Sequence, residues 1–160
     1  MTVSIFLKIE GIEGESTDAE HTNEIKLSSC SFSAHNSSAY NSASKTVSKG
    51  QAIMADIAFT KEADKTSVAL FKACASGKVY DKATISFQTN VGDDKKIDFL
   101  VYELENVVVN NYNFSASSEA DESGSVTYAK ITQKYDQRDE KGKSKGKVEG
   151  FFDVLKNAAG

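Results

Sequence analysis

Residues 56–77, DIAFTKEADKTSVALFKACASG, decide the fold class of this chain. They predict a strand, a short charged connector, and one amphipathic helix that stops at Gly77, because glycine readily takes the left-handed conformation that ends many helices. No other part of the sequence has convincing helical periodicity. One short helix in a chain that otherwise alternates like strands predicts a mainly β domain with a single helix docked on it.

The helix has an expected start and an expected packing face. Ser67 is the predicted N-cap, because its hydroxyl can accept a hydrogen bond from a free backbone N–H of the first turn, and Asp64 is the alternative. Leu70, Phe71 and Cys74 share one face of the helix. So short a helix does not persist alone in water, so we expect these three side chains to hold it against the sheets.

Period-two alternation of apolar residues predicts strands along the rest of the chain. They are expected near residues 5–9, 25–34, 53–59, 83–87, 97–104, 107–114, 126–135 and 148–155. The apolar parity switches between Leu27 and Cys30, which predicts a bulge or bend near Ser28 and Ser29. Strand 53–59 is apolar on both faces and is therefore expected to be central. Short strands separated by turn residues predict a two-sheet β-barrel or sandwich with one flanking short α-helix.

We expect residues 1–160 to form a single domain with one protruding segment. Residues 34–50, called the arm below, are rich in serine and contain only two bulky apolar side chains, Tyr40 and Val47. Such a segment cannot form a core of its own, so it is either a surface loop or an arm that is ordered only when a partner covers it. The tail, residues 157–160, is expected to fray.

Composition and charge argue against several classes of partner. The net charge is −4 with both signs mixed, whereas a nucleic-acid-binding domain is expected to carry a basic face. No apolar run approaches the roughly 20 residues of a membrane-spanning helix, and residues 1–11 lack the features of a signal peptide. We therefore expect no nucleic acid, no membrane insertion and no export by the general secretory route.

The sequence predicts no catalytic, cofactor-binding or metal-binding residue. His21 and His35 are the two histidines, and both lie in or beside polar segments, so we expect them to be solvated. Together with Cys30 they match no zinc-ligand spacing. Cys30 and Cys74 are expected to be reduced thiols, with a bridge between them as the alternative. A chain of this kind is expected to act through its surfaces and not as an enzyme.

Four stretches of the chain match one known family in wording and in order. They are FTKEADKTSVALFKACASGK at residues 59–78, IFLKIEGIEGESTDAEHTNEI at 5–25, LENVVVNNYNFSASSE at 104–119 and YDQRDEKGK at 135–143. They resemble the Hcp (haemolysin-coregulated protein) family, the tube proteins of bacterial type VI secretion systems. The first stretch is similar to the family's signature, and the four together extend over nearly the whole chain.

The resemblance implies a fold, an assembly and a set of partners. It implies two β-sheets that form a barrel, flanked by one helix, in a homo-hexameric ring. Rings would stack into a hollow tube that lies inside a contractile sheath, carries a VgrG-type spike and transports secreted effectors in its lumen. The protein would be cytoplasmic before assembly and then secreted through the type VI apparatus, with no cofactor.

The arm lies where the resembled family varies, so its contacts are a hypothesis from composition. We expect Tyr40, Asn41, Ser42 and Lys45 to make weak, polar contacts between stacked rings. Two other functions are weighed against the tube: a monomeric β-barrel that binds a small ligand or glycan, and a hydrolase built on loops. The mass in solution separates ring from monomer, and the hydrolase lacks a nucleophile–base pair.

Overall fold

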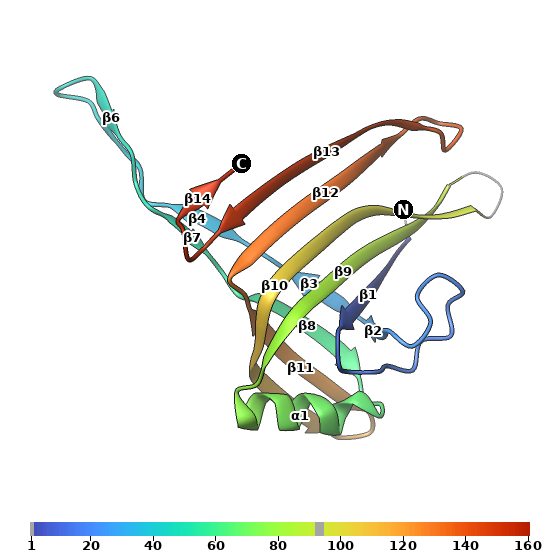
Figure 1. Ribbon diagram of the computed structural model, residues 1–160. Coiled ribbons are helices and arrows are strands. Elements are labelled where there is room, and N and C mark those ends of the chain that lie inside the picture. The colour runs from blue at the N-terminus through green and yellow to red at the C-terminus, as the bar shows by residue number, and fades with distance from the viewer. Residues whose placement is uncertain (1, 92–94) are drawn as a thin grey trace.

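The computed structural model describes residues 2–91 and 95–160, and it is mostly β-structure (Figure 1). Its helix is α1 (Thr66–Ser76), and within the described ranges no helix is long and apolar enough to cross a membrane. The strands are β1 (Val3–Ile9), β2 (Ile25–Leu27), β3 (Ser29–Ser31), β4 (Ala34–Asn36), β5 (Ala39–Asn41), β6 (Thr46–Ser48), β7 (Ala52–Met54), β8 (Ile57–Glu62), β9 (Val79–Val91), β10 (Lys95–Ala116), β11 (Ala120–Thr127), β12 (Lys130–Arg138), β13 (Ser144–Asp153) and β14 (Ala158–Ala159). The predicted fold class, mainly β with one short flanking helix, is confirmed.

Ten strands form one continuous sheet that folds over along β10 to give two layers (Figure 1). One edge of β10 pairs with β9, and the opposite edge pairs first with β12 and then with β11. One layer therefore runs β2-β1-β9-β10-β12-β13-β14, and the other runs β10-β11-β8-β3. The layers meet again at Ser28, where the chain leaves its pairing with β1 and begins to pair with β8. The bend predicted near Ser28 and Ser29 is thus confirmed, and it closes a barrel-like body.

β10 joins two segments that the sequence predicts as separate strands, 97–104 and 107–114. The polar pair Glu105 and Asn106 looks like a turn, but the ladder with β9 continues on both sides of it. Asn106 has a φ of 52°, a left-handed conformation that asparagine tolerates better than most residues. The prediction of two strands is wrong here because the chain bends at Asn106 without leaving the sheet.

Two other predicted strands are each broken in two. Residues 53–59 divide into β7 and β8, because β7 leaves the body to pair with β4. Residues 126–135 divide into β11 and β12 at Tyr128, which is buried and whose hydroxyl donates to the carbonyl oxygen of Ala55 at 2.9 Å. Apolar residues lie on both sides of each break, so the alternation alone does not show where β7 and β11 end.

The core lies between the two layers, and α1 lies across one end of the body (Figure 1). Leu70 and Ala73 attach the helix to this core, with 1% and 2% of their surfaces exposed. Burial of a leucine side chain contributes about 2 kcal/mol, so the core supplies the stability that the short helix lacks. The other fully buried members include Leu7, Ile9, Ile25, Ile57, Ile85, Leu104, Val107, Val109 and Val126.

Asp64, and not Ser67, caps the start of α1. Lys65 directly precedes the helix but has helical angles and makes no capping bond. Asp64 Oδ1 instead accepts hydrogen bonds from the backbone N–H of Thr66, at 2.8 Å, and from its hydroxyl, while Ser67 Oγ accepts one from Asp64 N at 3.1 Å. This reciprocal pattern is a capping box, so the alternative cap is correct. The predicted end is confirmed, since Gly77 has a left-handed φ of 64°.

The tail, residues 157–160, is paired and not frayed. β14 pairs with Phe152 and Asp153 of β13, and the backbones of Gly160 and Phe151 exchange hydrogen bonds of 3.0 and 2.7 Å. The expectation of a frayed tail is corrected because the free edge of β13 offers donors and acceptors that a terminal strand can use.

Candidate functional site

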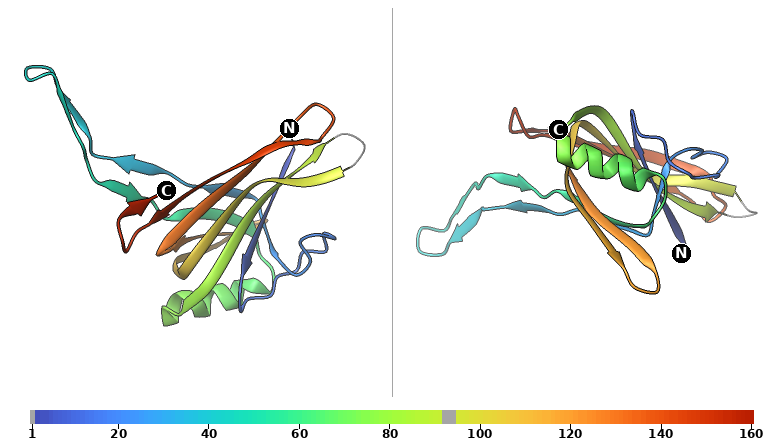
Figure 2. Two further views of the ribbon diagram at one scale, coloured as in Figure 1. Left: turned by 45° about the horizontal axis from the view of Figure 1, so that its top comes forward. Right: turned by 90° about the horizontal axis from the view of Figure 1, so that it is seen from below.

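The arm projects from the body as a β-hairpin and not as an irregular loop (Figure 2). β5 pairs with β6 near its tip, and β4 pairs with β7 at its base, so the hairpin extends beyond the arm to Met54. Residues 34–49 are all exposed. The backbone ladders and hydrogen bonds within the hairpin order the arm, for example the bond that Ser37 Oγ accepts from Gln51 N at 3.0 Å, and its side chains are exposed to solvent.

The four predicted contact residues lie at the tip of the arm, where their side chains differ in role. The Oδ1 atom of Asn41 accepts hydrogen bonds from two backbone N–H groups of the turn, at 3.0 and 3.1 Å, so this side chain builds the hairpin. Ser42 lies in that turn, and Lys45 follows it with a left-handed φ of 54°. Tyr40 is 67% exposed. Tyr40 and Lys45 are therefore the large side chains free to reach a partner.

The predicted packing residues of the helix divide between core and surface. Leu70 is buried and Cys74 is half-buried against the core. Phe71, however, is 57% exposed and touches the sheet only at its margin, where its ring meets that of Tyr112 at 6.3 Å. Ala73 takes the inner position that we expected Phe71 to hold, because the inward face follows the spacing from Leu70 to Ala73.

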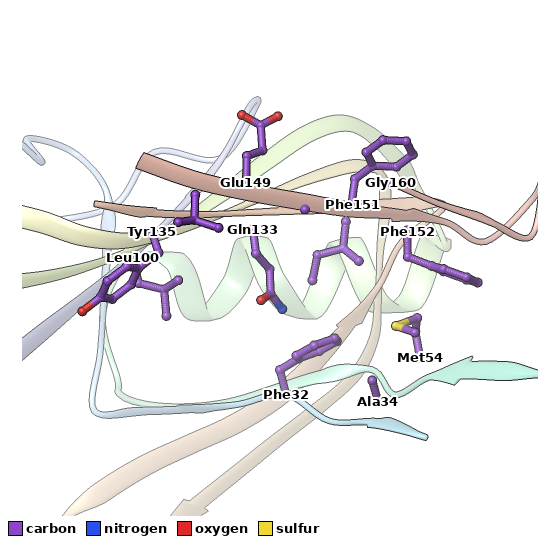
Figure 3. A pocket seen from close by; sticks show the side chains of 13 residues that line it. Phe32, Ala34, Met54, Leu100, Gln133, Tyr135, Glu149, Phe151, Phe152 and Gly160 are labelled. Atoms are coloured by element: carbon purple, nitrogen blue, oxygen red, sulfur yellow. The ribbon is translucent and has the colours of Figure 1, made fainter. Parts of the chain in front are cut away.

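An apolar pocket of about 410 Å³ opens between the layers near the base of the arm. Phe32 and Met54 line one wall, and Gln133 and Phe152 face them from β12 and β13 (Figure 3). Glu149 belongs to the lining but points away from the opposite wall. A small-ligand site usually combines apolar walls with converging polar groups. This pocket has the walls, but the polar groups of its lining do not converge.

The middle of the outer face of β3, β8 and β11 consists of small, uncharged side chains, while the exposed pair Glu62 and Asp121 lies at one end of this face. The hydroxyls of Ser29 and Thr60 lie 2.6 Å apart and share a hydrogen bond across neighbouring strands. A hollow of about 370 Å³ on this face has no charged lining residue; its polar members include Ser29, Ser31, Thr60, Asn113, Ser123 and Ser125. Such a surface can form many weak contacts, but it offers no strong anchor for a ligand.

His21 is buried, and the expectation that it is solvated is wrong. Its ring stacks on that of Phe6, with 4.5 Å between centroids. Nδ1 bonds to the carboxylate of Glu24, and Nε2 lies 2.8 Å from Asp98 Oδ1 on β10. Burial alone would lower the pKa of His21, but the hydrogen bonds and charges of Asp98 and Glu24 outweigh it and raise the pKa above its ordinary value. Two carboxylate partners fit a doubly protonated ring, which anchors the loop to the sheet.

The same cluster does not make a metal site. Glu20, His21 and Asp98 bring potential ligand atoms within 4.8 Å of one another. Both ring nitrogens of His21 are already engaged by carboxylates, so neither offers the free lone pair that a metal requires. Glu24 lies only three residues after His21, so the His21–Glu24 pair could have been predicted from the sequence. Asp98 lies on a distant strand, so its contact with His21 could not. His35 lies exposed on the arm.

A buried charged network braces the start of α1, and the sequence reasoning missed it. Lys61 is 1% exposed, and its Nζ atom bonds to Glu122 Oε2 at 2.5 Å and to Asp64 Oδ1 at 3.0 Å. The hydroxyl of Tyr112 donates to Glu122 Oε1 at 2.9 Å. Lys61 occupies an inward-facing position of β8, as Ile57 and Phe59 do. This alternation is the sequence feature from which the burial of Lys61 could have been predicted. The charged groups of the network are paired with one another, and the side chains of Lys61 and Glu122 are almost completely buried.

The two cysteines are free thiols. Burial raises the pKa of Cys30 to about 11, so this thiol stays protonated and unreactive near neutral pH.

Comparisons with known proteins agree over nearly the full length of the chain. The family model described as "Type VI secretion system effector, Hcp" matches residues 6–135. "Protein hcp1" of Pseudomonas aeruginosa is 27% identical over 161 residues, which is 98% of each chain. A solved structure of a type six secretion system protein is 26% identical, with a TM-score of 0.91 over 99% of this chain and 100% of the other. Hcp1 from Salmonella typhimurium is 27% identical, with a TM-score of 0.81 over 99% of both.

Proposed function

This chain belongs to the Hcp family of type VI secretion system proteins, and we propose that it is the subunit of the secretion tube. Six copies form a ring, and rings stack into a hollow tube. The tube carries a VgrG-type spike and leaves the cell when an outer sheath contracts, so no signal peptide is needed. The observation that carries this proposal is the arm, a hairpin held away from the body with residues 34–49 exposed.

Open strand edges support the ring. Among the described residues, β14 and Gly160 cover only the end of β13, from Phe151 to Asp153, so the rest of that edge has unpaired backbone groups. β3 pairs with β8 on one edge, and no strand in the described part of the chain pairs with its other edge. Subunits of a ring meet through two different surfaces of each copy, and unpaired edges readily accept a neighbouring chain. These two edges therefore suit the contacts between ring neighbours.

The arm suits contacts between rings. Tyr40, Asn41, Ser42 and Lys45 provide one aromatic ring, one positive charge and two small polar groups at its tip. Exposed polar contacts of this kind are individually weak. Rings that must stack and later separate benefit from such contacts, because none of them is slow to break.

The uncharged middle of the outer face of β3, β8 and β11 suits the wall of the lumen. Serine, threonine and asparagine side chains dominate it, and its hollow is free of charged lining residues. Cargo that has to be held and then released is served by many weak hydrogen bonds better than by ion pairs or apolar pockets. We propose that secreted effectors contact this face, and the proposal includes no catalytic step.

Light scattering coupled to size-exclusion chromatography tests the assembly. The expected result is a mass of six chains, and electron microscopy is expected to show rings and tubes. We propose that residues 1–160 of each subunit fold as a single domain. A mass of one chain would overturn the proposal and favour a monomeric barrel that binds a small ligand or glycan. The observation that favours this ligand-binding alternative is the apolar pocket of about 410 Å³.

A further inference from the structure

Acidic residues gather in one loop of the chain. Residues 10–24 contain six acidic side chains and no lysine or arginine. Three of the six have partners, since Asp18 pairs with Lys96 at 3.0 Å, Glu24 with His21, and Glu13 more loosely with Lys65 at 3.9 Å. Glu13 stays 67% exposed in that pair, and Glu10, Glu15 and Glu20 are exposed as well. The closer pairs fasten the loop to the sheet, so these four exposed carboxylates are presented on a fixed surface, called the acidic loop below.

The arm has the opposite charge character. Residues 25–55 contain no aspartate or glutamate, while Lys45 and Lys49 lie on the arm itself. Both lysines are exposed, and neither forms an ion pair among the described residues. The arm therefore presents uncompensated positive charge, as the acidic loop presents negative charge.

The arm and the acidic loop lie on opposite sides of the body. All three views of the ribbon show the arm leaving one side and the loop at residues 10–24 on the other (Figure 1; Figure 2). They cannot meet within one molecule. A second copy displaced along the line from loop to arm brings the arm of one copy against the loop of the next. A contact between two different surfaces of this kind repeats without closing, as stacking requires.

We infer that the acidic loop is the docking surface for the arm of a second copy of this chain. Lys45 and Lys49 of one copy face Glu13 and Glu15 of the next, and the aromatic ring of Tyr40 packs beside them. This inference rests on the proposed tube, to which it adds the surface that receives the arm. Another basic segment, residues 141–147, lies on the same side of the body as the acidic loop, so the same displacement does not bring the two together.

The contact depends on salt and on the number of arms. Exposed ion pairs are weak, and they are screened over about 8 Å at 0.15 M salt and about 3 Å at 1 M. Several arms that engage in parallel strengthen the association of two rings, because each later contact forms at a high effective concentration. Raising the salt concentration is therefore expected to dissolve stacks while the rings persist.

A charge exchange tests the inference. Lys45→Glu with Lys49→Glu, and separately Glu13→Lys with Glu15→Lys, are each expected to reduce the sedimented tube fraction by roughly two- to tenfold. The four changes together restore complementary charge and are expected to restore tubes. Lys141→Glu with Lys143→Glu, also exposed, is the matched control and leaves tubes unchanged. Light scattering reports the ring mass of every variant.

The outcomes distinguish a failure of the docking surface from a failure of the tube proposal. If wild-type rings stack but neither double variant loses tubes, or the fourfold variant does not regain them, the docking surface is wrong while the tube stands. If the wild-type chain forms no rings, the tube proposal fails at its first step. If rings form but never stack, the stacked tube and the docking inference both fail. Should a charge-reversed variant fail to fold by circular dichroism, Lys45→Gln with Lys49→Gln replaces it, and salt titration of wild-type tubes gives a readout without any substitution.

Discussion

His21 Nε2 lies 2.8 Å from Asp98 Oδ1, and this bond joins residues 77 positions apart in the sequence. It ties the acidic loop to β10, with Glu24 holding the other ring nitrogen and Phe6 stacked beneath the ring. The loop therefore has a fixed position although it contains no long strand or helix. The docking surface that we infer depends on this anchor, because it holds the carboxylates in place.

The anchor predicts a specific pH dependence. The pKa of His21 is raised in the folded chain above its ordinary value of 6.5, so folding favours the protonated ring. Its contribution to stability is fully present below about pH 6.5 and is lost as the pH rises through the folded pKa. We expect His21→Gln to cost about 2 kcal/mol at pH 6 and less at pH 9.

Denaturant unfolding of wild type and variant from pH 6 to pH 9 measures this difference. His35→Gln is the control, since His35 is exposed on the arm and its loss should leave the stability curve unchanged. A cost for His21→Gln that stays constant or grows with pH would contradict the charged anchor. Hydrogen exchange in residues 11–24 should also become faster in His21→Gln.

The Lys61–Glu122 pair predicts a non-additive double substitution. Removing one partner leaves a buried charge without compensation, so Lys61→Met and Glu122→Leu should each cost about 3–5 kcal/mol. The double variant replaces both charges by apolar side chains and should recover much of that loss. Thermal or denaturant unfolding measures all three, with the exposed Lys141→Met as a control near zero. Additive losses in the double variant would show that the two charges do not act as a pair.

The arm predicts a deletion that separates rings from tubes. Removal of residues 38–46 leaves the β4–β7 ladder and the whole core, so the melting temperature and the ring mass should stay as in wild type. Tube formation should fall, because the tip with Tyr40 and Lys45 is gone. Electron microscopy and sedimentation of the same sample check both expectations. Unchanged tube assembly in the deletion variant would remove the arm from the contacts between rings.

Helix packing predicts a contrast between two substitutions on α1. Leu70→Asp places a charge into the contact with the core, where Leu70 is 1% exposed, and should destabilise the subunit by about 3 kcal/mol or more. Val68→Asp is the matched control, because Val68 is 61% exposed on the same helix. Its effect should be near zero. An unaltered melting temperature for Leu70→Asp would refute the packing of the helix.

Local sequence features were sufficient for the elements with local causes. The alternation in residues 5–9 and 83–87 predicted strands that are observed as β1 and within β9. Gly77 predicted the end of the helix because its left-handed conformation is a property of one residue. Asp64 was only the alternative cap, and Phe71 was expected in the core. Both errors arise because a helix can be rotated or shifted by one residue without a change in its apolar periodicity.

The sequence by itself determined the mainly β class, the single helix, the exposed and acid-free arm, and the acidic character of residues 10–24. Each of these follows from composition or from spacing within a few residues. Only the tertiary structure decided that His21 meets Asp98, that Lys61 meets Glu122 and that the tail pairs with β13. Their partners lie on strands brought together by the folding of the sheet along β10, and local periodicity carries no information about which distant strands become neighbours.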